Sequence, residues 1–313
     1  MRRQLTDGLY IFNKPVGISS AGFLNQIKKR YVISKIGHGG TLDPFASGVL
    51  VVGVGRPYTK QLSEMLTHAT KEYEAVILLG ASSSTDDCTG DIEKNACVAP
   101  PTRQAVERAC RELQKREWQL PPRFSAIKID GVPAYAHARR GNDVPLEPKR
   151  VVIGDYCVNG VYKKNEELTE VDVGLTVSSG FYVRSFARDL GELLGVGGYV
   201  SALTRTRAGD FCLEQALETR DLDGVFEARA FWHGRVQGIG FRDFVRTAGN
   251  HCGVAGWVKN LPDRSVEGIA QGTMAQLDAF LKSVATEHAY ARNERCQTVF
   301  TKIIKNEVSF SVV

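Results

Sequence analysis

The chain lacks most features that would place it in a special class of protein. Its 313 residues carry a net charge of only +5, so charge alone does not indicate a nucleic-acid binder. No apolar run approaches the ~20 residues that a membrane helix needs, and the N-terminal sequence has no apolar core of a secretory signal. The seven cysteines form no C-x-x-C pair, so we predict reduced thiols in a cytoplasmic protein without a zinc site.

Nucleotide-binding loops are missing as well. The glycine-rich stretch "GVGRPYTK" (53–60) has neither the P-loop spacing nor the G-x-G-x-x-G pattern of a dinucleotide-binding turn. A nucleotide cofactor is therefore not indicated.

Strand and helix patterns alternate through the first 225 residues. A continuous apolar run bounded by glycines at 47–55 predicts a strand that is buried on both faces. Apolar residues at helical spacing, with Ser, Thr or Gly at the ends, predict helices at 21–31, 101–120 and 181–195. Further strands are predicted at 71–80, 150–162 and 168–180, and a strand, a tight turn and a helix at 121–141.

The order of elements changes near residues 221–228. A strand (227–233), a helix (241–252), two strands (254–271), a helix (273–285) and a last strand near 299–311 give the β-α-β-β-α-β order of ferredoxin-like folds. We therefore predict an α+β chain of two domains, 1–225 and 226–313. The first has a mixed, largely antiparallel sheet with flanking helices, and the second is a ferredoxin-like βαββαβ domain.

A single carboxylate, Asp43, stands in the glycine-rich stretch "GHGGTLDPFASGVL" (37–50). An Asp-Pro pair is commonly a turn, so a structural role is one interpretation. The other interpretation is a nucleophilic carboxylate, which needs a rigid strand edge, room for a large substrate and a nearby cation. His38 lies in the same stretch, where it could enter a nucleic-acid stack after a base has been flipped out.

Six segments, in the same order, resemble the TruB-type pseudouridine synthases, which modify position 55 of tRNA. They are "FNKPVGISS", "GHGGTLDPFASGVL", "KEYEAVILLG", "QLPPRFSAIKIDGVPAYAHARRG", "SSGFYVRSFARDLGELLG" and "LTRTRAGDFCLEQAL". The resemblance covers 1–225 and implies the pseudouridine-synthase sheet. It also implies a uridine in the T-arm of tRNA as the substrate, and no cofactor and no metal.

The same resemblance implies a role for each candidate residue. Asp43 is the nucleophile that attacks the ribose of the target uridine. Tyr73 stacks on the base, and Arg184 pairs with the aspartate and keeps it anionic. His38 fills the stack and, with Lys14, is placed on the substrate side, although Lys14 more readily supports the loop that holds Asp43.

The stretch "GRVQGIGFR" (234–242) ends the first strand of the second domain. Backbone N–H groups and a helix N-terminus could cradle a phosphate there, although a plain turn remains the alternative. With "GVAGWVKNLPD", "VEGIAQG" and "LDAFL" it resembles acylphosphatase. The resemblance implies catalytic roles for Arg242 and Asn260, a small acyl phosphate as substrate, and phosphate contacts from Gly234, Val236, Gln237, Gly238, Gly240 and Phe241.

Two alternatives to this interpretation stay open. The second domain could be a non-catalytic RNA-docking module, and the first could act mainly as a tRNA-folding chaperone. The second domain also departs from the acylphosphatase pattern, because Arg264 replaces the glycine usual after "PD" and "TEHAYA" (286–291) replaces a Gly-Pro-containing loop. The register of the last strand is open for that reason.

Overall fold

The structure, a computed structural model, describes residues 3–95, 99–129, 131–142, 144–165, 167–288 and 291–313. The chain forms two compact units. Unit 1 contains Met1–Pro44, Gly48–Met65 and Asp210–Val313, and unit 2 contains Phe45–Ser47 and Leu66–Gly209. Unit 1 thus joins the N-terminal segment of the chain to its C-terminal part.

The N-terminal part of unit 1 is built on two buried strands. Strand β2 (Gly8–Lys14) pairs antiparallel with β5 (Ser47–Val54), and β4 (Ile36–Gly39) pairs antiparallel with the other edge of β5. The buried strand predicted at 47–55 is confirmed. Helix α1 (Ser20–Arg30) is capped at its N-terminus by Ser19, whose side chain accepts a hydrogen bond from the Gly22 amide. Strands β1 (Arg3–Gln4) and β3 (Tyr31–Val32) pair in parallel, and α2 (Arg56–Thr67) is a helix that we did not predict.

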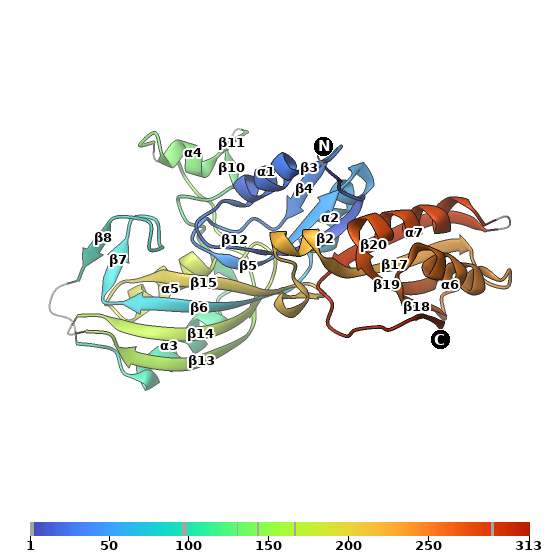
Figure 1. Ribbon diagram of the computed structural model, residues 1–313. Helices are drawn as coiled ribbons and strands as arrows, with labels where there is room; N and C mark the ends of the chain where they lie inside the picture. The colour runs from blue at the N-terminus through green and yellow to red at the C-terminus, as the bar shows by residue number, and fades with distance from the viewer. Residues whose placement is uncertain (1–2, 96–98, 130, 143, 166, 289–290) are drawn as a thin grey trace. The chain divides into compact units, whose positions relative to one another are not determined.

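The C-terminal part of unit 1 has the predicted β-α-β-β-α-β order. It comprises β17 (Val225–Arg235), α6 (Phe241–Cys252), β18 (Ala255–Asn260), β19 (Val266–Thr273), α7 (Met274–Thr286) and β20 (Arg292–Thr301). The strands lie in the order β20-β17-β19-β18 and are all antiparallel. Helices α6 and α7 pack side by side on one face of this sheet (Figure 1). The core between them holds Trp232, Phe241 and Phe280.

The last strand differs from the prediction. Strand β20 ends at Thr301, not near residue 311, and a separate strand β21 (Phe310–Val312) pairs in parallel with β18. A buried side chain forms hydrogen bonds to the segment between them. Gln271 donates to the Lys305 carbonyl (2.6 Å) and accepts from the Glu307 amide (2.9 Å).

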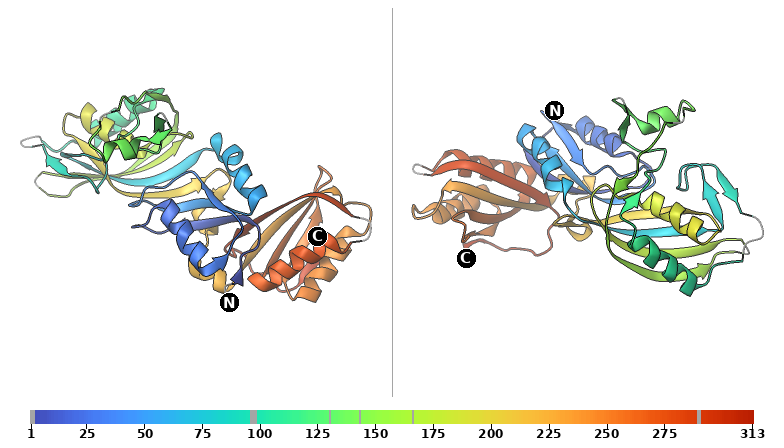
Figure 2. Two further views of the ribbon diagram at one scale, coloured as in Figure 1. Left: turned by 90° about the horizontal axis from the view of Figure 1, so that it is seen from above. Right: turned by 180° about the vertical axis from the view of Figure 1, so that it is seen from behind.

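Unit 2 is a four-stranded antiparallel sheet with two helices on one face (Figure 2). Its strand order is β13 (Ile153–Lys163), β14 (Thr169–Val177), β6 (Lys71–Leu79) and β15 (Gly198–Ala208). The helices are α3 (Arg103–Gln114) and α5 (Val183–Leu193). The sheet strands predicted at 71–80, 150–162 and 168–180 are confirmed, as is the helix predicted at 181–195. The helix predicted at 101–120 ends earlier, at Gln114, and Trp118–Gln119 form a short strand instead.

Smaller elements complete unit 2. They are β7 (Ala81–Ser83) with β8 (Ile92–Lys94), β9 (Trp118–Gln119) with β12 (Lys149–Arg150), and the hairpin β10 (Lys128–Ile129) and β11 (Val132–Pro133) followed by α4 (Ala134–Ala138). The hairpin and helix were predicted at 121–141. Asp130 in the hairpin turn lies outside the described residues. The predicted α+β class, with a largely antiparallel sheet and a ferredoxin-like C-terminal part, is confirmed.

Candidate functional site

The residues on both sides of Asp43 are fixed by hydrogen bonds to their backbone groups. The Ser20 hydroxyl donates to the Leu42 carbonyl (3.1 Å) and accepts from the Leu42 amide (2.9 Å). On the other side, the Gly17 amide donates to the Pro44 carbonyl (2.7 Å). Asp43 itself is half-buried. The two neighbours of the carboxylate are therefore fixed to α1 and to the turn before it, as a positioned reactive group requires.

Lys14 stabilises that turn. Its side chain is fully buried, and its ammonium donates to the carbonyls of Pro15 (2.8 Å) and Ile18 (2.7 Å). Burying an ammonium is costly unless such acceptors surround it. The turn it holds contains Gly17, which has a φ of +87° and reaches Pro44. The geometry favours the supporting role of Lys14 over direct contact with a substrate.

His38 lies on β4, opposite Val52 of β5, and is half-buried. Its strand leads directly into the loop that carries Asp43. Unit 1 therefore contains Lys14, His38 and Asp43. The first two lie on β2 and β4, which both pair with β5, and Asp43 lies in the loop that follows β4.

Tyr73 and Arg184 belong to unit 2. Tyr73 is buried on β6, and its paired neighbours are Leu175 on β14 and Arg205 on β15. Two residues before it, Lys71 is also buried and donates to the Ser179 hydroxyl (3.1 Å). Burial, and then the charge of Arg205, lower the pKa of Lys71 to about 8.

Arg184 is buried on the first turn of α5. Its guanidinium donates to the carbonyls of Thr85 (3.2 Å) and Phe124 (3.0 Å), and it lies 3.6 Å from a carboxylate oxygen of Asp87. Asp87 is buried too and accepts hydrogen bonds from the side chains of Thr85 (2.7 Å) and Thr89 (2.5 Å). The sequence analysis did not single out Asp87. Its only signal was the adjacent acid pair in the polar loop after β6.

The five synthase candidates are thus divided between the two units, three in unit 1 and two in unit 2. The pairing of Arg184 with Asp43, and the stacking roles of Tyr73 and His38, stay predictions.

The glycine-rich loop of the C-terminal part has the backbone of an open cradle. Gly234, Gly238 and Gly240 have φ values of +115°, +74° and +76°. Residues other than glycine rarely adopt this backbone conformation. A Cβ atom at Gly238 or Gly240 would meet nothing within 4 Å, so the inner side of the loop is open. Arg242 is half-buried on the first turn of α6.

Gln237 ties this cradle to the turn that follows Asn260. Its side-chain amide donates to the carbonyls of Leu261 (3.1 Å) and Ser265 (2.8 Å). Asn260 is exposed at the end of β18, directly before that turn. The loop and Asn260 are therefore brought to the same corner of the C-terminal part. Gln237 uses its donors on the turn, while Val236 and Phe241 are buried under the loop and offer only backbone amides to a ligand.

Arg264 occupies the same turn with a strained backbone. Its φ is +68°, which suits the glycine that the acylphosphatase pattern has there. Asp263 braces the turn by accepting from the amide (3.0 Å) and the hydroxyl (2.5 Å) of Ser265. These bonds lower the pKa of the Asp263 carboxyl. These bonds hold the turn in a shape in which Arg264 has a left-handed backbone.

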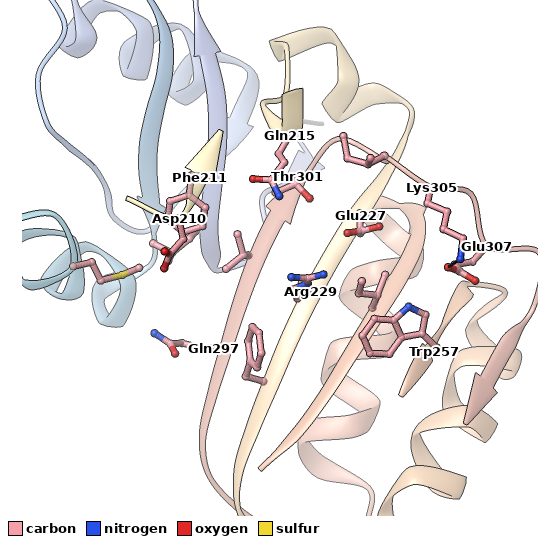
Figure 3. Close-up of a pocket in the computed structure, with 16 residues that line it drawn as sticks. Asp210, Phe211, Gln215, Glu227, Arg229, Trp257, Gln297, Thr301, Lys305 and Glu307 are labelled. Atoms are coloured by element: carbon pink, nitrogen blue, oxygen red, sulfur yellow. Dashed lines mark ion pairs between the residues drawn. The ribbon is translucent and has the colours of Figure 1, made fainter. Parts of the chain in front are cut away.

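A cavity of about 670 Å³ lies on the sheet face that α6 and α7 leave uncovered (Figure 3). Arg229, Trp257 and Glu227 project into it from the sheet, and Phe211 and Lys305 line its rim. Burial raises the pKa of Glu227. No residue of the glycine-rich loop lines the cavity, and neither does Asn260.

Among the residues that the structure describes, no three His, Cys, Asp or Glu side chains form a metal site. Within the same part of the chain, no helix combines the length and apolarity needed to cross a membrane.

The fold and the two glycine-rich loops define an α+β chain that carries a ferredoxin-like part at its C-terminal side. Residues 28–183 match the family described as TruB family pseudouridylate synthase (N terminal domain), and 184–237 match the tRNA pseudouridylate synthase B C-terminal domain. Residues 228–312 match acylphosphatase. The chain belongs to the TruB family, with an acylphosphatase domain after the family segment.

Two relatives and one solved structure illustrate this membership. The tRNA pseudouridine synthase B of Mycobacteroides abscessus is 42% identical over 219 residues, which are 70% of this chain and 73% of that protein. The enzyme of the same name from Thermobifida fusca is 40% identical over 225 residues, covering 71% and 76%. A chain in the crystal structure of a Cbf5-Nop10-Gar1 complex aligns with a TM-score of 0.50 and 28% identity, covering 69% of this chain and 53% of that chain.

Proposed function

We propose that the chain isomerises a uridine at position 55 in the T-arm of tRNA to pseudouridine, with Asp43 as the nucleophile. Membership of the TruB family supports the reaction. The observation that carries the assignment to Asp43 is the double attachment of its neighbours: Leu42 to Ser20, and Pro44 to Gly17. A tRNA substrate is in keeping with the cytoplasmic location predicted from the sequence.

The chemistry needs one carboxylate and no external reactant. Asp43 attacks the ribose C1′, and the bond from C1′ to uracil N1 breaks. The uracil turns, C5 bonds to C1′ and the carboxylate is released. The C5 proton leaves and N1 gains one, so the product is an isomer of the substrate. In this proposal Tyr73 stacks on the base, Arg184 keeps the carboxylate anionic, and His38 fills the space left by the flipped base.

Mapping the product tests this reaction. The purified chain is incubated with an unmodified tRNA transcript, and each uridine is examined for conversion. Pseudouridine at position 55 alone supports the proposal, and no conversion there contradicts it. A tRNA-folding chaperone would raise the folded fraction of the tRNA without forming pseudouridine, so the same experiment separates the two functions.

Arg184 offers a second test through the split between turnover and binding. We expect Arg184→Ala to lower kcat far more than it weakens tRNA binding, because a carboxylate without its cation is a poorer nucleophile at neutral pH. A loss confined to tRNA affinity would make Arg184 a phosphate contact instead. Because Arg184 also faces Asp87, thermal unfolding must be measured alongside.

Exposed basic clusters support RNA binding in each unit. Lys28 and Lys29 end α1 in unit 1, and Arg139 and Arg140 follow α4 in unit 2. If they contact phosphates, tRNA affinity falls steeply with salt because counterions are released. An affinity that does not change with salt would assign these clusters to solvated surface.

We also propose that the C-terminal part hydrolyses small acyl phosphates. Arg242 would pair with two phosphate oxygens, and the amides from Val236 to Phe241 would take the remaining charge. Asn260 would orient a water that attacks phosphorus, so that the bond from phosphorus to the acyl oxygen breaks and a carboxylate leaves. The open left-handed loop and its tie to the turn after Asn260 support this proposal.

Hydrolysis of a simple acyl phosphate by the full chain tests the second activity. We expect Arg242→Ala and Asn260→Ala each to abolish it, and Arg235→Ala, an exposed arginine outside the predicted contacts, to preserve it. No hydrolysis of the acyl phosphate by the folded wild-type chain would contradict this second activity.

A further inference from the structure

The C-terminal part of unit 1 completes the sheet that supports Asp43. One edge of β2 pairs with β5, and part of the other edge pairs in parallel with β20, where Leu9 lies opposite Val299 and Tyr10 opposite Phe300 (Figure 1). An unpaired strand edge exposes amide and carbonyl groups that require partners. Strand β20 supplies partners to a strand whose residues from Leu9 to Phe12 are fully buried.

Tyr58 of α2 contacts the edge of β20 beyond the residues that pair with β2. Its hydroxyl accepts a hydrogen bond from the Thr298 amide (3.2 Å) and donates to the Cys296 carbonyl (3.3 Å). One side chain therefore satisfies a donor and an acceptor of β20, as a neighbouring strand would. Both Tyr58 and Thr298 are buried, so water cannot readily replace the hydroxyl.

Aromatic packing closes the same contact. The rings of Tyr10 and Phe300 stack with centroids 4.4 Å apart, and Phe226 meets Phe300 edge-on at 5.9 Å. Gly8 makes room for this stack, because a Cβ atom there would lie 2.4 Å from the Phe300 ring. All three rings are fully buried. The contact has the packing of a domain core and not of two domains that touch at their surfaces.

The connection into β17 is equally fixed. A 3-10 helix (Thr219–Asp223) ends two residues before β17, and Leu222 and Phe226 on either side are buried. Asp223 pairs with Arg30 (2.5 Å) and accepts from the Tyr31 hydroxyl (3.2 Å). The chain therefore passes from one segment to the next without a flexible linker.

We propose that the acylphosphatase-like part is a structural component of the Asp43-bearing half, and that the two fold as one cooperative unit. Strand β2 connects them, because it pairs with β20 near its start and ends at Lys14, whose ammonium holds the turn that contacts Pro44. A ligand that binds only the folded C-terminal part must then stabilise β2 and β5 as well. This last consequence, and it alone, depends on the proposed phosphate-binding loop.

Amide hydrogen exchange in the full chain tests the coupling, read by mass spectrometry in peptides from β2, β20 and the 234–241 loop. Tyr58→Phe removes only the bridging hydroxyl. We expect exchange in both β2 and β20 to become about tenfold faster or more, because a buried donor and a buried acceptor lose their partner. Tyr162→Phe, at an exposed tyrosine of unit 2, is the matched control and should leave both unchanged. Faster exchange in β20 with no change in β2 would overturn the proposal.

Inorganic phosphate provides the second arm. At about 100 times its dissociation constant, it should slow exchange through the shared opening by about 100-fold in the loop and in β2 alike, and Arg242→Ala should abolish both effects. Protection of the loop without β2 would overturn the coupling. Protection of neither would contradict the phosphate-binding loop of the proposed function, and the Tyr58→Phe arm would then decide the coupling by itself.

Discussion

Ser20 and Leu42 exchange two hydrogen bonds through one hydroxyl group, which donates to the Leu42 carbonyl and accepts from its amide. Ser20 is fully buried on the first turn of α1, and Leu42 directly precedes Asp43. The helix therefore fixes the backbone from which the proposed nucleophile projects.

Ser20→Ala tests this positioning. We expect kcat for pseudouridine formation to fall about 10- to 100-fold, since small misplacements of a reacting group are costly, and stability to fall by about 1–3 kcal/mol. Ser19→Ala is the matched control. It removes the N-cap of the same helix and about 1 kcal/mol of stability, but it leaves Leu42 untouched. If both variants lose kcat equally, helix stability and not the contact with Leu42 explains the loss.

Asp87→Ala should destabilise the chain by about 3–5 kcal/mol, because it removes the buried carboxylate that faces the buried Arg184 guanidinium. The pair is 3.6 Å apart with both side chains buried. Asp155→Ala, at an exposed aspartate of the same unit, should change stability by less than about 0.5 kcal/mol. Urea unfolding measures the free energy of unfolding of both variants. Equal effects in the two variants would show that the buried pair has no special weight.

Lys71 predicts a specific dependence of stability on pH. Its folded-state pKa of about 8 lies below the ordinary value of 10.5. Between these values the unfolded chain binds more protons, so the contribution of this residue to stability increases as pH rises across that window. The Lys71→Met substitution removes this pH-dependent contribution to stability. The stability of the variant relative to wild type should therefore fall between pH 8 and pH 10.5. A constant difference between the two proteins across this window would contradict the prediction.

Arg264→Gly should stabilise the C-terminal part by about 1 kcal/mol, because it removes the cost of a left-handed backbone at a residue with a side chain. Arg264→Ala is the control that removes the same exposed side chain but keeps that cost. Thermal unfolding of the two variants distinguishes backbone strain from loss of charge. Equal stability of the Gly and Ala variants would argue against strain.

Local sequence signals predicted some elements closely. Helix α6 was predicted at 241–252 and begins and ends at those residues, because Gly240 and Gly253 flank it with left-handed backbones. Strand β5 was clear from its unbroken apolar run. The Asp43 loop and the 234–242 loop stood out as glycine-rich stretches. The roles of their residues came from the family motifs, because periodicity alone does not indicate a chemical role.

Other features depend on residues far apart in the chain. The buried Gln271 side chain hydrogen-bonds to Lys305 and Glu307, in the segment between β20 and β21. The parallel pairing of Leu9 with Val299, and the bridge from Tyr58, join segments that no local pattern connects. The partner of Asp87 became evident only when α5 packed against the loop after β6. Contacts between residues far apart in the chain determine each of these features, so they could not be predicted from the sequence alone.

The central claim is that Asp43 performs the nucleophilic step of pseudouridine formation. Single-turnover conversion of tRNA by excess Asp43→Asn enzyme tests it most directly, because binding is saturated and product release does not limit the signal. Asp7→Asn, at another unit 1 aspartate, is the control. We expect full tRNA binding by Asp43→Asn with no pseudouridine at position 55, and normal conversion by the control. Conversion by Asp43→Asn at a rate close to that of the wild type would contradict it.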